Sequence, residues 1–281
     1  MQASGEQYEI VHGDAHAVAV EVGGGLRAFS VGGRDVLLPY AADDLARAAR
    51  GQVLAPWPNR LADGSYTFGG RELQLPVDEL DTHTAIHGLV RFANWTCVRH
   101  DRSDVELEHV LHPQPGYPFL LRLHVAYGLG DDGLTVETSA ENAGTEACPF
   151  GVGHHPYLAG DVDGLTVSLP ARTRFAVDDR GLPTGREPND LPETFVVGDR
   201  HINTTFTDLE RREVTVGGFV VWFDELFPYV QLFTGDHPHV ERRGLAVEPM
   251  TCPPNAFRTG EGLIVLQPGE TFRGRWGIRP A

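Results

Sequence analysis

The chain contains no lysine, and all 23 of its cationic side chains are arginines. Enzymes that form a Schiff base, bind pyridoxal phosphate or hold a nucleotide in a P-loop depend on a lysine amine, so these classes are excluded. Aspartate and glutamate number 39, which gives a formal net charge of −16 at pH 7. A surface of that sign repels the phosphates of nucleic acids and of anionic membranes, and we expect neither as a partner.

Cysteine is scarce, with Cys97, Cys148 and Cys252 as the three thiols and no CxxC pair among them. This pattern favours neither a disulfide framework nor a zinc site, and it is typical of buried free thiols in a reducing compartment. Residues 1–10 lack the charged and apolar segments of a signal peptide, and no apolar run approaches the length of a membrane span. We therefore expect a cytoplasmic protein.

Apolar and polar residues alternate along much of the chain with a period of two, which predicts β-strands rather than helices. The clearest case is a predicted hairpin in which residues 120–129 and 134–141 flank the turn at 131–133. Further strands are predicted at 105–111, 165–169, 213–216 and 219–223. A second hairpin is predicted at the C-terminus, where residues 263–266 and 271–278 flank Pro268-Gly269.

Helical patterns are rare. A short helix capped by Asp43 is predicted over residues 44–50, and residues 178–200 and 236–243 are predicted to be surface loops. No linker, repeat or low-complexity block divides the 281 residues, and 33 glycines and 20 prolines fit many tight turns. We expect an all-β protein: one large antiparallel β-sandwich domain spanning residues 1–281.

Two histidines and one glutamate, each in a Gly/Pro-rich segment, are candidates for proton transfer: His87, His155 and Glu248. Rigid loop or strand-end positions often carry functional groups, and imidazoles and carboxylates are common acids and bases. His154 and His155 are adjacent, so on a strand they point to opposite faces. We expect His155 to enter a cleft together with Tyr157, while His154 packs inside the protein.

Glu248 follows an apolar run at 245–247, which predicts the end of a buried strand. Desolvation there would raise the carboxyl pKa and improve Glu248 as a base near neutrality. The alternative is a strand-end carboxylate paired with Arg242 or Arg243. A glycosidase would need a second catalytic carboxylate, and residues 224–225 offer an aspartate and a glutamate.

Arg60 ends a stiff segment with two prolines, and its guanidinium fork suits the hydroxyls of a sugar. Trp57 offers an aromatic face for the sugar's C–H surface. A surface arginine in a Pro-rich turn is the simpler interpretation of Arg60 alone. His237 and His239, with Glu241 following, have a metal-ligand spacing, but their segment is polar and broken by proline, and we expect no metal site.

These segments, taken together and in order, resemble the aldose 1-epimerase (galactose mutarotase-like) family over nearly the whole chain. The matching residues are Pro56 to Arg60, His87-Gly88, Gly153 to Leu158, Phe233 to Gly235, Val247 to Pro249 and Leu266 to Glu270. The resemblance implies a large β-sandwich of the galactose mutarotase-like (supersandwich) type, an open cleft for an aldose sugar, and a reaction without cofactor or metal. A monomer or homodimer is expected.

The resemblance also implies roles for individual residues. Glu248 matches the general base that takes the proton from the C1 hydroxyl, and His155 matches the general acid that protonates the ring oxygen O5. His87 matches the histidine that holds the sugar near O5, and Arg60 matches the arginine that contacts ring hydroxyls. The implied reaction interconverts the α and β anomers of a hexose by ring opening and reclosure. We expect residues 59 and 157, an asparagine and a tyrosine, to line the sugar site.

One position departs from the family pattern. Asn203 stands where the family usually has an aspartate that binds sugar hydroxyls, and Asp208 is an alternative for that role. Two other functions stay open: a hexose-6-phosphate 1-epimerase, with Arg91 and Arg122 as candidate phosphate ligands, and a non-catalytic sugar-binding protein. A glycosidase or lyase on a related β-sandwich is a third.

Overall fold

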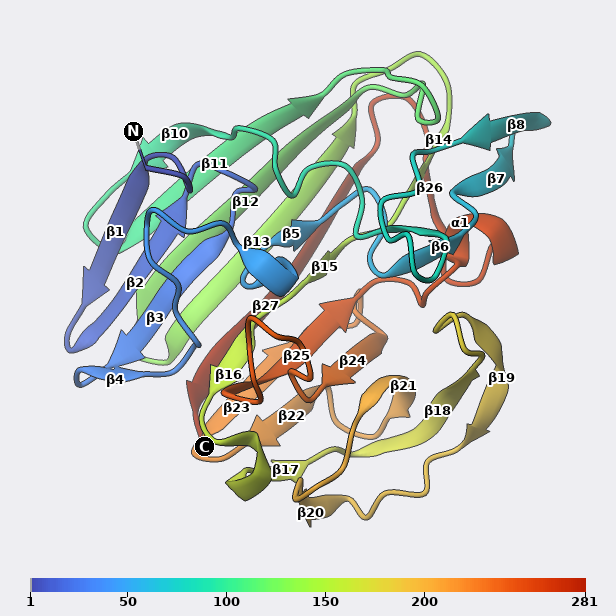
Figure 1. The fold of residues 1–281 in the computed structure, drawn as a ribbon. Helices are drawn as coiled ribbons and strands as arrows, with labels where there is room; N and C mark the ends of the chain where they lie inside the picture. The colour runs from blue at the N-terminus through green and yellow to red at the C-terminus, as the bar shows by residue number, and fades with distance from the viewer. Residues whose placement is uncertain (1) are drawn as a thin grey trace.

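A nine-stranded antiparallel sheet is the largest layer of the computed structural model, which describes residues 2–281 (Figure 1). In spatial order its strands are β10 (Thr96–His100), β11 (Asp104–Leu111), β12 (Leu121–Gly130), β13 (Gly133–Asn142), β27 (Thr271–Pro280), β23 (Phe219–Phe223), β22 (Glu213–Val216), β17 (Thr166–Ser168) and β20 (Thr194–Val196). The predicted hairpin is confirmed, because β12 pairs with β13 throughout.

An eight-stranded sheet carries most of the candidate site residues. Its strands are β19 (Pro183–Pro188), β18 (Ala171–Val177), β21 (Asn203–Leu209), β24 (Tyr229–Phe233), β25 (Gly244–Met250), β15 (Gly153–His154) and β5 (Val53–Leu54), with β16 (Tyr157–Ala159) paired to β25. Leu232 and Val247 of this sheet share one hydrophobic cluster with Val221 and Phe223 of the nine-stranded sheet. The two sheets form the predicted antiparallel β-sandwich.

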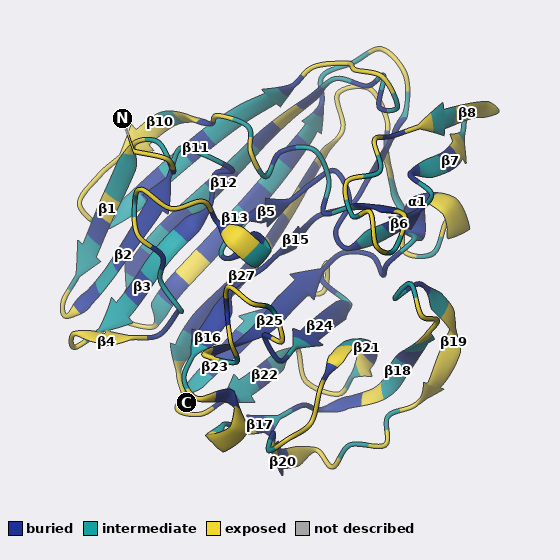
Figure 2. Ribbon diagram, viewed as in Figure 1, coloured by how far each residue is buried: buried dark blue, intermediate teal, exposed yellow. Residues whose placement is uncertain are grey.

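Burial follows the position of each strand in the sandwich. Figure 2 shows buried and less buried residues alternating along β12, because only one face of that strand meets the core. All seven residues of β25 are buried. A strand covered on both faces can bury a polar side chain as well, and β25 contains Glu248.

The remaining strands of residues 2–281 form a four-stranded sheet and three short pairs. The sheet contains β1 (Gln7–His12), β2 (Ala15–Val20), β3 (Leu26–Val31) and β4 (Arg34–Asp35); the pairs are β6 (Arg60–Ala62) with β9 (Thr84–Ile86), β7 (Ser65–Phe68) with β8 (Arg71–Gln74), and β14 (Cys148–Phe150) with β26 (Ile264–Leu266). Helical segments are η1 (Arg47–Ala49), η2 (Val162–Gly164) and α1 (Ala256–Thr259). No helix among these residues is long and apolar enough to cross a bilayer.

The predicted C-terminal hairpin is wrong, although both of its strands exist. β26 pairs with β14, whereas β27 enters the nine-stranded sheet between β13 and β23. A central position gives β27 hydrogen-bonding partners on both edges, which a terminal hairpin would not provide. The strands themselves were predictable from alternation, but their partners were not.

The predicted helix over residues 44–50 is also wrong. The segment contains only the three-residue turn η1, in which Ala48 and Ala49 have φ angles of 54° and 56°. Left-handed residues cannot continue a right-handed helix. The predicted loop at 178–200 contains β19 and β20, which corrects that prediction, whereas 236–243 contains neither helix nor strand, as predicted.

Candidate active site

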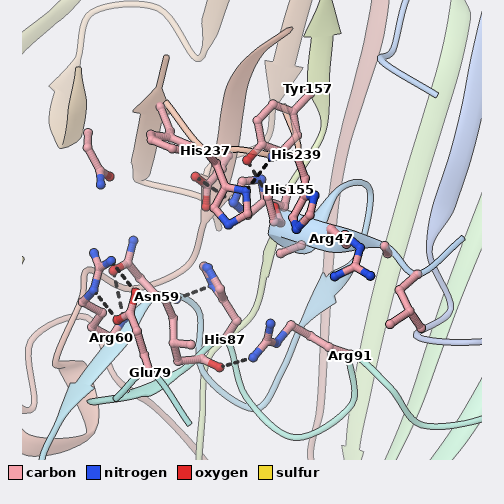
Figure 3. Close-up of a pocket in the computed structure, with 18 of the residues that line it drawn as sticks. Arg47, Asn59, Arg60, Glu79, His87, Arg91, His155, Tyr157, His237 and His239 are labelled. Atoms are coloured by element: carbon pink, nitrogen blue, oxygen red, sulfur yellow. Dashed lines mark hydrogen bonds and ion pairs between the residues drawn. The ribbon is translucent and has the colours of Figure 1, made fainter. Parts of the chain in front are cut away.

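A cavity of about 460 Å³ opens beside the eight-stranded sheet (Figure 3). Its volume falls within the range of about 300–1,000 Å³ typical of small-molecule sites. The lining includes seven of the site residues predicted from the sequence, although they come from five separate parts of the chain: Asn59, Arg60, His87, His155, Tyr157, Asn203 and Glu248. The fold therefore brings these seven residues together.

Glu248 lines this cavity and is 2% exposed. The strand β25 continues through Met250, so Glu248 is inside the strand rather than at its end, which corrects the prediction. Arg242 pairs with Asp163 and Asp236, and Arg243 with Glu241, so the alternative pairing of Glu248 with either arginine is wrong. The Oε2 atom of Glu248 is buried without a hydrogen-bond partner in the described residues, and burial raises its pKa well above the ordinary value.

His155 is the neighbour of this carboxyl. Its Nε2 atom lies 3.4 Å from Oε1 of Glu248, and its ring stacks on Tyr157 with centroids 4.9 Å apart and an interplanar angle of 17°. The Tyr157 hydroxyl in turn donates to the carbonyl of Ala48 at 3.1 Å, which fixes the stack. Burial lowers the pKa of His155 to about 3. Burial thus favours a neutral imidazole beside a protonated carboxyl, so that the pair holds one proton.

His154 points away from the cavity, as the alternation predicts. Its Nε2 atom lies 2.8 Å from the Thr138 hydroxyl, and its ring packs on Trp276 with centroids 5.2 Å apart. Burial lowers the pKa of His154 to about 3. His154 is therefore a core residue that does not line the cavity.

The tautomer of His87 follows from its backbone environment. The Asn59 backbone N–H donates to Nδ1 of His87 at 3.1 Å, so Nδ1 is unprotonated and Nε2 carries the hydrogen. Burial lowers the pKa of His87 well below its usual value, which keeps the ring neutral. The ring faces that of His155 edge-on, with centroids 5.4 Å apart. His87 therefore offers one N–H donor at the cavity.

Gly88 allows the close approach that places His87. A Cβ atom at Gly88, which has a φ of 74°, would lie 2.0 Å from the carbonyl oxygen of Ala55. That oxygen instead accepts a hydrogen bond from the Leu89 backbone at 2.7 Å. Close packing of the backbone thus explains the glycine at position 88, and the cavity site explains the histidine at position 87.

Arg60 is held by a carboxylate that the sequence analysis missed. Glu79 accepts from Nε and Nη2 of Arg60 at 2.6 and 2.7 Å, and the hydroxyls of Thr82 and Thr84 donate to it as well. Burial alone would raise the pKa of Glu79, but these hydrogen bonds outweigh burial and lower it. The glutamate therefore stays ionised and orients Arg60. Trp57 does not line the cavity; it packs on Phe257, which contradicts the predicted aromatic face for a sugar.

Replacing Glu79 by glutamine should lower the free energy of unfolding by about 1–3 kcal/mol, because it leaves a half-buried guanidinium with a weaker partner. Urea titration measures this difference. Glu146→Gln is the matched control, since its pair with Arg71 is exposed and should contribute less than about 1 kcal/mol. Equal effects of the two substitutions would contradict the orienting role of Glu79.

Asn203, rather than Asp208, lines the cavity. The Asn203 Oδ1 atom accepts from Nε2 of Gln231 at 2.6 Å. Asp208 lies at the other end of β21 and accepts from the Thr173 hydroxyl at 2.6 Å, so it is not available as a substitute. His237 and His239 also line the cavity, but residues 2–281 contain no group of three or more His, Cys, Asp or Glu side chains arranged to hold a metal ion.

The family model described as aldose 1-epimerase matches residues 6–279. The chain belongs to the aldose 1-epimerase family. Two relatives of this family member from Escherichia coli K12 are uncharacterized proteins: YihR, 37% identical over 97% of this chain and 92% of the relative, and YphB, 34% identical over 97% and 98%. Human galactose mutarotase is 29% identical over 48% of this chain and 41% of its own length.

Solved structures share the aldose 1-epimerase fold. A GalM/aldose epimerase homologue from C. elegans has a TM-score of 0.86 at 16% identity and covers 98% of this chain and 99% of its own. A galactose mutarotase-like protein from Clostridium acetobutylicum has a TM-score of 0.85 at 19% identity, with 97% and 94% covered. At these identities the likeness establishes the fold alone.

Proposed function

We propose that this protein is a mutarotase, an aldose 1-epimerase that interconverts the α and β anomers of a hexose. The observation that carries the proposal is the buried pair of His155 and Glu248, whose side chains line the cavity 3.4 Å apart. Opening a hemiacetal ring requires one base and one acid and no redox group. A pair that holds one proton supplies both, whichever partner carries the proton before the sugar binds.

The proposed reaction moves two protons in opposite directions. Glu248, as the carboxylate, takes the proton from the O1 hydroxyl while His155, as the imidazolium, protonates O5, and the bond between C1 and O5 breaks. The products are an open-chain aldehyde, a neutral imidazole and a carboxylic acid, so the proton count is conserved. Rotation about the C1–C2 bond presents the other face of the aldehyde, and ring closure returns both protons.

Neighbouring residues support this arrangement. The N–H of His87 is positioned to donate to O5 or O1, and the Arg60–Glu79 pair and Asn203 offer donors and acceptors for ring hydroxyls. Among residues 2–281 the carboxylates that line the cavity are Glu79 and Glu248, and Glu79 is engaged by Arg60. A glycosidase mechanism with residues 224–225 lacks support, because neither lines the cavity.

Polarimetry on freshly dissolved α-glucose and α-galactose tests the proposal. The wild-type protein should accelerate the approach to anomeric equilibrium for at least one of a panel of aldoses, and His155→Gln should lose most of that acceleration. Sugar-dependent thermal stabilisation with no acceleration would instead support a sugar-binding protein. Release of reducing ends from a disaccharide would support a glycosidase.

A further inference from the structure

Asn203 carries hydrogen-bond donors that no protein group uses. Two arginines of the cavity, Arg60 and Arg91, are paired with carboxylates, and Arg122, which the sequence suggested as a phosphate ligand, does not line the cavity. Asn203 accepts one hydrogen bond through Oδ1, from Nε2 of Gln231 at 2.6 Å, whereas its Nδ2 atom has no partner in the described residues. The residue is exposed and lines the cavity. The amino end of this amide is therefore available to a ligand.

A row of buried polar side chains supports Asn203 from within the sheet. Thr205 of β21 lies opposite Gln231 of β24, which lies opposite Glu248 of β25. Residues directly opposite each other project from the same face of a sheet, and so do residues two apart on one strand. Asn203, Thr205 and Gln231 are therefore on the face that carries Glu248. Thr205 and Gln231 are only 2% and 3% exposed, so neither competes with Asn203 for a ligand.

The Thr205 hydroxyl sets the direction of the hydrogen bonds along this row. It donates to Oε1 of Gln231 and has no other partner among residues 2–281. Turning the Gln231 amide would remove that acceptor and leave a buried O–H unpaired, which is unfavourable. Nε2 of Gln231 therefore faces Asn203 and donates to its Oδ1 atom. Because the oxygen of Asn203 is held by Gln231, the nitrogen is the end left for the cavity.

Building on the proposed function, we propose that Asn203 is a specificity-determining residue that donates an N–H to the bound sugar, with Thr205 and Gln231 as the positioning residues that fix this polarity. An aspartate at position 203 would accept from Gln231 through one oxygen and present the other to the sugar. It would thus require a hydroxyl that donates. Asn203 requires only an atom that accepts, which an ether oxygen or a fluorine can do as well as a hydroxyl.

The contacted group is a ring substituent other than the anomeric hydroxyl. In the proposed reaction O1 and O5 lie at Glu248 and His155, so the substituents at C2, C3, C4 and C6 are left for Asn203. Replacing one of these hydroxyls by hydrogen removes both donor and acceptor. Replacing it by fluorine removes the donor and keeps an acceptor. The difference between the two analogues therefore reports the polarity of the protein group that faces that position.

The test measures dissociation constants by calorimetry for glucose and galactose, each as the parent sugar and as its deoxy and deoxyfluoro analogues at these four positions. At one position we expect the deoxy sugar to bind less tightly than the parent, and the fluoro sugar to bind about two- to tenfold more tightly than the deoxy sugar. This is the range for one neutral hydrogen bond. In Asn203→Asp the order of the two analogues should reverse, because a carboxylate repels fluorine.

Two further variants test the positioning role. Thr205→Val removes the donor that fixes Gln231, so both amides can turn and the fluoro-to-deoxy ratio should fall toward one. Thr207→Val is the matched control: it removes a buried hydroxyl on the same strand that donates to the Pro228 carbonyl, and it should keep the wild-type ratio. Thermal melting checks that the variants are folded. Asn203 is exposed, so Asn203→Asp tests the proposal even if Thr205→Val does not fold.

The proposal is overturned if no position shows tighter binding of the fluoro sugar than of the deoxy sugar, or if Asn203→Asp keeps the wild-type order. Because binding is measured rather than turnover, its failure is distinguishable from that of the proposed function. If the wild type anomerises no sugar but the order still reverses in Asn203→Asp, the mutarotase assignment fails and the donor role of Asn203 stands. An active enzyme without the reversal retains the assignment and excludes this role.

Discussion

Replacing Glu248 by glutamine is expected to lower kcat for anomer interconversion by about 10²- to 10⁴-fold, the usual contribution of a placed general base. Glutamine has the same shape as the protonated carboxyl that burial favours at this position, but it cannot accept the O1 proton. Polarimetry at saturating sugar measures kcat, and sugar-dependent thermal stabilisation shows whether binding persists. The expected result is a folded, sugar-binding protein that is nearly inactive.

The control for this substitution is Glu225→Gln, which removes a carboxylate exposed outside the cavity and should leave kcat unchanged. The stability of Glu248→Gln gives a second check. Because the folded-state pKa of Glu248 is raised above the ordinary 4.5, its ionisation destabilises the fold as pH rises above that value. Glutamine has no such cost, so the variant should not be less stable than the wild type at pH 8. A Glu248→Gln protein with more than a tenth of the wild-type kcat would exclude Glu248 as the base.

The regular strands were predictable because the burial of one strand face produces an alternation of apolar and polar residues in the sequence. Along β12 the inward side chains from Leu121 to Leu129 are buried and the intervening ones are less so, which is the alternation that the sequence displays. The predicted bounds of β22 and β23 match the observed ones. Each of these strands has one face against the core, so its pattern can be recognised without knowing its neighbours.

Pairing between distant strands was not predictable. β27 lies between β13 and β23, and nothing within Thr271–Pro280 identifies those partners. The turn at Ala48 and Ala49 is a similar case, because alanine normally favours helix and only tertiary contacts hold two alanines at positive φ. Local propensity was overridden there by packing, including the hydrogen bond from Tyr157 to Ala48.

The candidate site was predictable where a residue's own neighbours are distinctive, as for His155 and Glu248. Its supporting residues were not. Glu79 reaches Arg60 only because β6 pairs with β9 and the intervening loop folds back. Arg47 lies in a segment that looked helical, and it enters the cavity because that segment is a turn. Such residues become visible only once the long-range pairings are known.

Acid should destabilise this protein well before its carboxylates are protonated, because buried histidines stay neutral in the folded state. His154 is the residue at which this effect can be measured separately. Its pKa falls from an ordinary 6.5 to about 3 on folding because the ring is buried against Trp276 and Phe227. Below pH 6.5 His154 is protonated in the unfolded chain but stays neutral in the folded chain. The free energy of unfolding therefore falls as pH decreases from 6.5 toward 3. The slope is about 1.4 kcal/mol per pH unit, or about 2 kcal/mol between pH 7 and pH 5.

His154→Gln tests this argument, because an amide can keep the hydrogen bond to Thr138 but does not titrate. The variant should be less stable at pH 7, since it loses ring packing, yet its free energy of unfolding should fall less steeply with acid, by about 1.4 kcal/mol per pH unit. Urea titrations at intervals from pH 7 to pH 4.5 measure both slopes. His201→Gln, at a histidine whose side chain is 76% exposed, should keep the wild-type slope. His155 is a less informative site for this test. Glu248 binds a proton more tightly in the folded state, which opposes the effect of the buried His155 imidazole on the pH dependence of stability.

If His154→Gln keeps the wild-type slope as well, the buried imidazole of His154 does not cause the acid sensitivity.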